Sequence, residues 1–490
     1  MTRTQLIRAL VAAAPAAALA VLAGCASLAP PLPKAEPQIP AQWPAPPAPT
    51  AGASAPAPSA AGAPATPAAA ETPAADIGWR DFFVDPALKE LIGLALAHNR
   101  DLRISVLDVE RARALYRVQR ADRFPTLGAT ASESHSGGGS SRPASPDLYT
   151  VSVGITSFEL DLFGRVHDLS RSALQQYFAQ DATRRAAQIS LVAEVADAWL
   201  TLAADQESLR IARETLTTRS EAYRLVGDQH TFGAASGLDV AQAQTLMESA
   251  RADVARFSGA VESDRNALRL LVGAPIEERL FLTRLDATAT GSAPIPAGLP
   301  STVLLRRPDV EAAEHQLRAA NASVGAARAA FFPSIKLTAG AGTMSTELSG
   351  LFSGGSQFWS FAPQVDLSIL DPGRLEGNLQ AARAEQAIAL AQYEKAVQSG
   401  FREVSDALAL TQTLAAQRDA QQAFVAAATR SEHLSLARYR AGRDSYLVEL
   451  DAQRTLYAAQ QSLVASELAV ATNRVTLYKV LGGGWVETTR

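Results

Sequence analysis

The stretch RYRAGRDSYLVELDAQRTLY, Arg438 to Tyr457, decides the fold because an earlier part of the same chain repeats it. Its motif residues recur at a constant separation of 209 positions: Gly442, Ser445, Leu447, Ala452 and Gln453 correspond to Gly233, Ser236, Leu238, Ala243 and Gln244. A constant offset separates a duplication from chance similarity between alanine-rich segments. The sequence therefore predicts two structural repeats.

Each copy also carries an apolar residue at every seventh position after its glycine. These residues are Met247, Val254, Val261 and Leu268 in the first copy, and Leu456, Leu463, Val470 and Leu477 in the second. A seven-residue apolar period holds one face of a helix against a partner and produces a left-handed supercoil. Each copy is thus predicted to contain a coiled-coil hairpin, with its turn at Gly233 or Gly442.

Composition limits the classes of protein to which the chain can belong. It has 490 residues and a formal net charge of −4, so nothing indicates binding to nucleic acid. The duplication indicates two intertwined halves of one body instead of unrelated domains. Aromatic residues make up only 6% of the chain, which together with abundant alanine favours closely packed helices. Alanine richness can also reflect genome composition.

The N-terminus has the features of an export signal. Arg3 and Arg8 precede an apolar run that ends at Leu22 and is too short to remain as a membrane span. The run leads into LAGC, whose last residue, Cys25, is the only cysteine of the chain. This resembles a bacterial lipoprotein signal, which implies removal of residues 1–24 and attachment of acyl chains such as palmitate at Cys25. The alternative is an unmodified thiol.

Residues 25–75 form a linker of Pro, Ala, Gly and Ser with almost no large apolar side chain. Such a segment cannot bury enough surface to offset its ordering entropy, and proline keeps it extended. We expect a disordered stalk between the lipid and a folded body that begins near Trp79. In lipoproteins of this pattern, Ala26 in place of Asp after the cysteine implies the outer membrane as destination.

Two alternating segments predict β-hairpins. An amphipathic helical pattern from Pro86 to about Ala121 is followed by FPTLGATASES, and its counterpart 208 positions later reads FPSIKLTAGAG. Each is followed by a Gly/Ser-rich loop and a second alternating run, which gives hairpins at 125–162 and 333–370. Strands of about 10 to 13 residues can cross a bilayer when they are tilted.

The second strand of each hairpin has a distinct apolar pattern. In the first hairpin the alternation changes phase at Ser157, which predicts a β-bulge. In the second hairpin one face is shared by Trp359, Phe361, Val365, Leu367 and Ile369.

Four such strands cannot close a barrel alone. Unpaired edges are not tolerated in hydrocarbon, and the smallest membrane barrels have about 8 strands. The hairpins must therefore be pooled between at least two subunits if they span a membrane. The alternative is a soluble four-stranded sheet with one face packed on helices; the lipoprotein signal favours the membrane.

Long helical runs follow the strands. Proline is absent and glycine nearly so from Gly164 to about Asp228, and again from Gly373 to about Ala441. At 1.5 Å per residue each run would measure roughly 100 Å if it were continuous.

The lipoprotein signal, the duplicated FP hairpin, LRRPDVEAAEHQL at Leu305–Leu317 and RAGRDSYLVELDAQ together resemble the outer-membrane efflux factors of the TolC/OprM type, the RND efflux outer membrane lipoprotein family. The resemblance covers Trp79 to Trp485. It implies a mixed α and β membrane protein: a homotrimer with a twelve-stranded transmembrane β-barrel, four strands per chain, and a twelve-helix periplasmic tunnel. Residues 275–308 would form an equatorial connection between repeats 76–274 and 309–482, with 483–490 as a C-terminal tail.

The same resemblance assigns roles at the hairpin tips. It implies that Asp451 forms an acidic ring at the periplasmic aperture, and that Tyr439 and Asp239 take part in the bonds that close it. Asp444 stands where one branch of the family has a basic residue, so the pairing partners stay open. The first copy has Gln242 at the position of Asp451, so the ring would come from one copy only. The alternative is that these are solvated charges on helix surfaces.

Catalytic and metal-binding patterns are not found. The six histidines have no metal-ligand spacing, and the sequence contains neither a phosphate-binding loop nor a GxSxG elbow. We therefore predict no enzyme activity, no metal and no cofactor.

The sequence thus predicts a passive outer-membrane exit duct for small molecules. An inner-membrane pump, of the RND type by resemblance, would deliver them through a periplasmic adaptor protein. Two alternatives remain: a conduit for type I polypeptide secretion, and a non-conducting structural lipoprotein of the cell envelope. Neighbouring genes would distinguish these functions, and the sequence does not identify the cargo.

Overall fold

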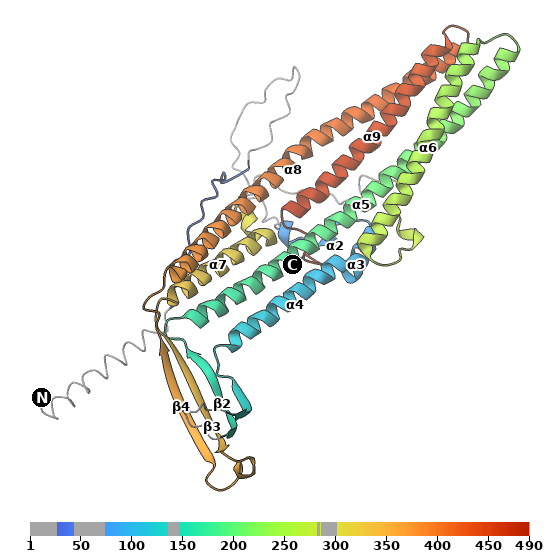
Figure 1. Ribbon diagram of the computed structural model, residues 1–490. Helices are drawn as coiled ribbons and strands as arrows, with labels where there is room; N and C mark the ends of the chain where they lie inside the picture. Colours follow the sequence, from blue (N-terminus) through green and yellow to red (C-terminus); the bar gives the residue numbers. More distant parts are fainter. Residues whose placement is uncertain (1–26, 44–73, 136–146, 282–284, 286–300, 490) are drawn as a thin grey trace, which may run out of the picture. The chain divides into compact units, whose positions relative to one another are not determined.

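The computed structural model describes residues 27–43, 74–135, 147–281, 285 and 301–489 (Figure 1). The chain forms two compact units. The first, here called the strand unit, comprises the described parts of 1–36, 107–181 and 312–395. The second, the helical unit, comprises the described parts of 37–106, 182–311 and 396–490.

The strand unit contains one antiparallel sheet with the order β1-β2-β3-β4. Its strands are β1 (Leu127–Ser134), β2 (Leu148–Leu160), β3 (Ser334–Ser345) and β4 (Gln357–Asp366). Both predicted hairpins are present, and β2 pairs with β3 to join them. β1 has 8 residues and is shorter than the predicted length, whereas β2 has 13.

The predicted irregularity in β2 is confirmed. The pairing of β2 with β3 shifts register between Ile155 and Phe158, and Ser157 has a φ of 55°. A bulged residue can adopt this left-handed conformation because it leaves the regular ladder. The prediction for the end of β4 was wrong: the strand stops at Asp366, so Leu367 and Ile369 lie beyond it. There the chain turns into the next helix, where Asp371 accepts a hydrogen bond from the backbone N–H of Arg374.

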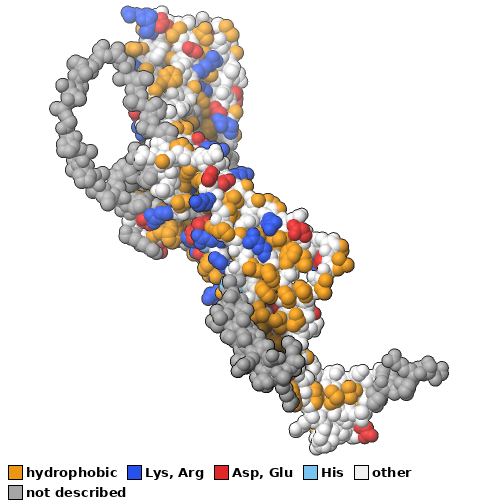
Figure 2. Space-filling model, turned by 90° about the vertical axis from the view of Figure 1, so that its left-hand side faces the viewer, with side chains coloured by type: hydrophobic (Ala, Val, Ile, Leu, Met, Phe, Trp, Pro, Cys, Tyr) orange, Lys and Arg blue, Asp and Glu red, His pale blue; other side chains and the backbone are white. Residues whose placement is uncertain are grey.

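Each of the two outer strands of the described sheet has one unpaired edge. Within the residues described, β1 pairs only with β2 and β4 only with β3, and every residue of β1 is exposed. Large apolar side chains of β4 are also exposed, with Trp359 at 79% and Phe361 at 60%. Figure 2 shows hydrophobic side chains at the surface of the sheet. Unpaired edges and an apolar surface fit strands that are completed by other subunits in a membrane.

The helices repeat with the sequence. α5 (Arg165–Thr231) and α8 (Arg374–Arg440) each have 67 residues and begin 209 positions apart. α6 (Gly237–Val272) has 36 residues and α9 (Tyr446–Val480) has 35. α4 (Arg100–Ala121) and α7 (Pro308–Ala329) both have 22. The duplication read from the motifs is therefore also a duplication of secondary structure.

α5 is long and apolar enough to pass a length-and-composition test for a membrane-spanning helix. Its most apolar stretch is 56% buried by other parts of the chain, however. That burial is typical of a core helix.

The helical unit has its core where the two short helices α2 (Trp79–Phe82) and α3 (Pro86–His98) meet the long ones. Trp79, Trp199 and Tyr478 are each at most 2% exposed, and the rings of Phe82 and Tyr478 stack 3.9 Å apart. None of the eight residues of the predicted seven-residue repeat is exposed. The heptad face therefore packs inward, as the coiled-coil prediction requires.

Short elements fix the connections. The predicted helix at 86–121 is divided into α3 and α4 by Asn99, whose side chain donates to Leu271 O at 2.8 Å and accepts from Leu102 N. Trp199 Nε1 donates to Leu280 O at 3.0 Å, which holds the described start of the 275–308 connection on α5.

The remaining described elements are the 3₁₀ helices η1 (Ala74–Asp76), η2 (Glu278–Leu280), η3 (Ser301–Arg306) and η4 (Leu348–Gly350).

A buried arginine joins three segments of the helical unit. Arg307, in the LRRPD motif, donates to Asp309 at 2.8 Å and to Glu403 of α8 at 2.7 Å. Its Nη1 also donates to Val480 O, at the end of α9, at 2.8 Å. Gly400 of α8 leaves the space that this side chain occupies, since a Cβ there would lie 3.3 Å from Arg307 Nε.

The prediction of a disordered stalk is wrong for residues 27–43. In the strand unit, Ser27 Oγ donates to Asp168 at 2.6 Å, and Asn321 Nδ2 donates to Pro30 O at 3.0 Å. In the helical unit, Trp43 is only 6% exposed and stacks on Phe401 at 5.4 Å. The composition argument failed here because one tryptophan and a row of backbone carbonyls are enough to bind this segment to helices. The signal peptide, Cys25 and residues 44–73 lie outside the described residues.

Candidate functional site

Two helix turns lie at the same end of the helical unit (Figure 1). Gly233 has a φ of 74° and Gly442 a φ of 67°, a conformation that favours glycine. In both turns the backbone closes in the same way: Ala234 N donates to Gln229 O at 2.8 Å, and Arg443 N to Arg438 O at 3.0 Å. These are the bonds of a Schellman motif, which explains why both copies need glycine at this position.

An apolar cluster holds the two turns together. Its buried members come from three helices: Val226, Ala243, Leu246, Tyr446 and Leu450. The Tyr439 ring packs against Tyr446 with a centroid separation of 5.2 Å. The hydroxyl of Tyr439 donates to Gln229 Oε1 of α5 at 3.1 Å, so the end of α8 is bonded to the neighbouring hairpin.

The structure does not bond Tyr439 to Asp239, the two residues that we expected to close the aperture. Asp239 forms a capping box with Ser236 at the start of α6, in which its Oδ2 accepts from Ser236 N at 2.9 Å. Burial, and then the negative charge of Asp239, raise the pKa of Tyr439. The two side chains therefore interact electrostatically without a hydrogen bond between them. Sequence reasoning missed Gln229, since nothing in the pattern of α5 distinguishes this glutamine from its neighbours.

Asp444 and Asp451 have different surroundings. Arg438 holds both carboxylate oxygens of Asp444, at 2.5 Å from Nε and 2.8 Å from Nη2, and this bond lowers the pKa of Asp444. The partner that the sequence left open is thus Arg438, within the same turn. Asp451 is exposed on α9 and makes no hydrogen bond or ion pair with any described residue. Its carboxylate is free to face solvent or a neighbouring copy.

Glu449 of α9 is a further acidic residue that the sequence did not single out. Glu449, two residues before Asp451, is only 1% exposed although it lies in the first turns of α9. Its Oε1 accepts from Gln453 Nε2 at 2.8 Å. Only the folded structure separates these two acids, because Glu449 faces inward on α9 and Asp451 faces outward.

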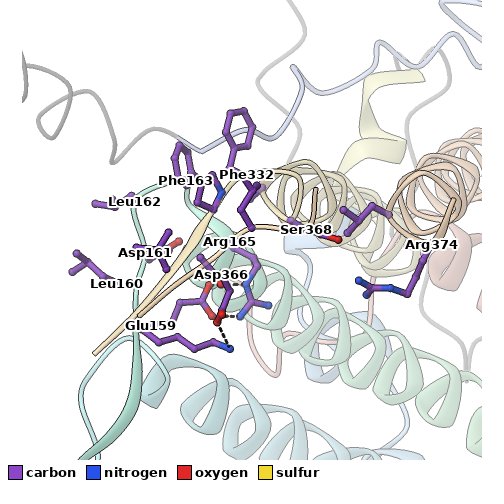
Figure 3. Close-up of a pocket in the computed structure, with 18 residues that line it drawn as sticks. Glu159, Leu160, Asp161, Leu162, Phe163, Arg165, Phe332, Asp366, Ser368 and Arg374 are labelled. Carbon is purple, nitrogen blue, oxygen red and sulfur yellow. Dashed lines mark hydrogen bonds and ion pairs between the residues drawn. The ribbon is translucent and has the colours of Figure 1, made fainter. Parts of the chain in front are cut away.

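In the strand unit, charged residues gather where the strands meet the helices (Figure 3). An open cavity of about 680 Å³ lies between the ends of β2, β3 and β4 and the starts of α5 and α8. Arg165 Nε donates to Glu159 at 2.8 Å, and Lys336 pairs with Asp366 at 3.3 Å. Glu159 and Lys336 are direct cross-strand partners, so these charges share one face of the sheet.

The lining of this cavity is partly charged and partly aromatic. Charged side chains at the strand ends pair with each other and leave the cavity polar on one side, while Phe163 and Phe332 stack at 4.6 Å on another part of its wall. Among the described residues, no group of three or more His, Cys, Asp or Glu side chains is placed to hold a metal ion.

Comparison with known proteins decides the family. Residues 91–274 and 299–483 match the family model of the outer membrane efflux protein, one segment on each repeat. The chain belongs to the outer membrane efflux protein family. The recognition from sequence motifs, the mixed α and β channel fold and the outer-membrane location are thereby confirmed.

Curated relatives of this outer membrane efflux protein cover most of its length. The probable efflux pump outer membrane protein TtgC of Pseudomonas putida is 46% identical over 423 residues, which is 85% of this chain and 87% of the relative. The probable outer membrane lipoprotein SilC of Salmonella typhimurium is 40% identical over 414 residues, or 84% of this chain and 89% of that protein.

Solved structures give the same result for the fold. The open state of the MtrE outer membrane channel of Neisseria gonorrhoeae matches with a TM-score of 0.83 and 38% identity, over 95% of this chain and all of that one. CusC matches with a TM-score of 0.78 and 40% identity, over 84% of this chain and 97% of that one. The efflux-channel function predicted from the sequence agrees with these relatives.

Proposed function

We propose that this efflux protein works as a homotrimeric, passive exit duct. The observation that carries the proposal is the four-stranded sheet with two unpaired edges, β1 and β4, in a chain whose strands lead directly into α5 and α8. Three copies would supply twelve strands, which satisfies the minimum of about 8 for a membrane barrel. The same three copies would supply the long helices of α5, α6, α8 and α9 for a periplasmic tunnel.

The proposed partners are an inner-membrane pump, of the RND type, and a periplasmic adaptor protein. The relatives support this because they carry the names of efflux pump components, including a toluene efflux pump outer membrane protein and an antibiotic efflux pump outer membrane protein of Pseudomonas putida. Small organic molecules are the proposed cargo. The duct itself consumes no energy, so the pump must supply the driving force.

Asp451 is the proposed constriction of this duct. It is exposed on α9 near the Gly442 turn and lacks a partner among the described residues. Three such carboxylates close to a threefold axis would concentrate cations in a narrow mouth. Glu449 would not contribute to this ring, because it is buried within its own chain.

We expect purified wild-type trimer to conduct ions in a planar bilayer, with block by divalent cations. Asp451→Asn should weaken this block several-fold without changing trimer assembly, because the three charges that attract the cation are removed. The measurement is single-channel current against divalent cation concentration. Unchanged block would place Asp451 on a solvated helix surface away from the pore. A trimer that inserts and does not conduct would instead favour a structural envelope lipoprotein.

Lipidation at Cys25 is proposed as an anchor that the fold does not require. We expect Cys25→Ser to remove acylation while the trimer still forms, because closure depends on strands and helices. Acyl chains contribute about 0.8 kcal/mol per buried methylene and tether without spanning. Intact-mass spectrometry of the mature protein is the measurement. An unmodified Cys25 in the wild-type protein would refute the lipid anchor.

A further inference from the structure

Glu449 is a buried carboxyl group with an incomplete set of partners. The residue is 1% exposed, and its Oε2 atom has no hydrogen-bond partner in the part of the chain that the structure describes. Its other oxygen, Oε1, accepts from Gln453 one turn further along α9. A buried carboxylate with an unsatisfied oxygen is costly, whereas the protonated acid is tolerated much better.

The duplication shows that the packing at this position does not need an acid. The residue 209 positions earlier is Val240, at the corresponding place near the start of α6. Val240 packs against the apolar cluster that joins the two turns. An apolar side chain therefore serves the same helix position in the first copy, and the carboxyl group of Glu449 is an addition specific to the second.

The surroundings of Glu449 come mainly from the end of α8. Glu432 and Arg440 of α8 act on its charge with opposite signs, and Gln453 of α9 donates to it. Tyr439 of α8 and Tyr446 of α9 also face it. From α5 and α6, Arg219 and Asp239 act on Tyr446, the residue that joins this region to the apolar cluster.

The net electrostatic effect favours the neutral acid in the packed turn. Burial is the largest cause that raises the pKa of Glu449 above its ordinary value of 4.5, and the charge of Glu432 adds to it. A carboxyl whose pKa is raised binds its proton more tightly in the packed state than in an opened, solvated one. The packed turn therefore has its full stability below the ordinary pKa, and loses stability as the pH rises above 4.5 toward the raised pKa.

We propose that Glu449 is a pH-sensitive switch in the α8–α9 turn, which holds the turn packed when it is protonated and loosens it when it is ionised. The inference rests on the proposed function, a duct that opens at these turns. Leu450, its neighbour in sequence, and Tyr446 belong to the cluster that holds α9 on α5 and α6. Loosening of α9 at Glu449 would therefore also weaken the attachment of the second hairpin to the first, including the bond from Tyr439 to Gln229.

The direct test is hydrogen exchange of the full-length trimer, measured by mass spectrometry at about pH 5 and about pH 8 and corrected for the intrinsic pH dependence of exchange. In the wild-type protein, peptides covering 438–452 should lose protection several-fold at the higher pH. Glu449→Gln should stay protected at both, because it is neutral and nearly isosteric. Glu449→Val places the residue of the first copy at this position and should also stay protected at both pH values. It keeps the test valid if the glutamine side chain of Glu449→Gln packs poorly.

Glu248→Gln is the matched control, since Glu248 is an exposed acid of α6 whose side chain is 45% exposed. It should keep the wild-type response to pH. Equal protection of 438–452 at both pH values in the wild-type protein, or a wild-type response in both Glu449 variants, would overturn the switch. This readout does not depend on conduction, so it separates failure of the switch from failure of the proposed duct.

Single-channel recordings show whether a pH dependence of channel opening comes from Glu449 or from Asp451. Asp451 is the neighbouring acid on α9, so its variant tells an effect of Glu449 from an effect of the proposed aperture ring. If Glu449 is the switch, the open probability should rise with pH in the wild-type protein and in Asp451→Asn, and stay low in Glu449→Gln. A response that is lost in Asp451→Asn and kept in Glu449→Gln would assign it to the aperture ring and reject the proposal.

Discussion

A cysteine introduced at Gly354 is expected to react with a membrane-impermeant maleimide on intact cells. Gly354 lies in the loop between β3 and β4, and a Cβ there would meet no atom within 4 Å. The proposed topology places this loop outside the cell, so the reagent should reach it without damage to the outer membrane. The effect is close to all-or-none, because a thiol on the wrong side of the membrane is not labelled.

The matched control is a cysteine at Arg443, an exposed residue of the α8–α9 turn. This turn would lie in the periplasm and should be labelled only after the outer membrane is permeabilised. The wild-type chain gives the background, since Cys25 is its only cysteine and a lipid on its sulfur would block the thiol. Gly138, in the other hairpin loop, is an equivalent position but lies outside the described residues. Protection of the cysteine at position 354, together with labelling of the cysteine at position 443 on intact cells, would show the opposite orientation in the membrane and contradict the proposed topology.

Arg307→Met is expected to lower the free energy of unfolding by about 3 kcal/mol. The Arg307 guanidinium is 9% exposed and donates to Asp309, Glu403 and Val480 O. The variant therefore loses a side chain that joins α8 to the end of α9. The cost lies at the low end for a buried ion pair, because Asp309 and Glu403 are 46% and 39% exposed and stay hydrated. The Val480 carbonyl would lose its donor.

Arg306→Met provides the comparison, because it removes the neighbouring arginine. Arg306 pairs with Asp76 at 2.7 Å, but its side chain is 50% exposed, so the loss should be less than about 1 kcal/mol. Thermal unfolding of both variants in detergent, followed by far-UV circular dichroism, measures the difference. Equal melting temperatures for the two variants would show that the Arg307 bonds do not stabilise the helical unit.

Features that depend on local pattern could be predicted from the sequence. Two copies of one motif, 209 positions apart, gave the turns at Gly233 and Gly442 and placed the ends of the long helices within a few residues. The phase change at Ser157 gave the bulge, because side chains in a strand alternate and one extra residue reverses their faces.

Features that depend on contacts between distant segments could not be predicted. Trp43 looked like part of a disordered linker, and only the folded helices provide Phe401 for its ring. The pairing of Tyr439 with Gln229 depends on the register between α8 and α5, which no local pattern specifies. Glu449 and Asp451 are both acids of one helix, and the sequence alone does not show that one is buried and the other exposed.

The two helix turns share a backbone but differ in how their second helices begin. Ser236 and Asp239 cap α6 reciprocally, whereas Ser445 makes no side-chain cap on α9. A cap of this kind contributes about 1 kcal/mol. In the proposed trimer, the six turns would have nearly sixfold symmetry. The capped α5–α6 turns, which are stiffer, would alternate with the uncapped α8–α9 turns, which are more flexible. The ring would then have only threefold mechanical symmetry, and three α8–α9 hairpins could swing outward while three α5–α6 hairpins remain as a fixed frame.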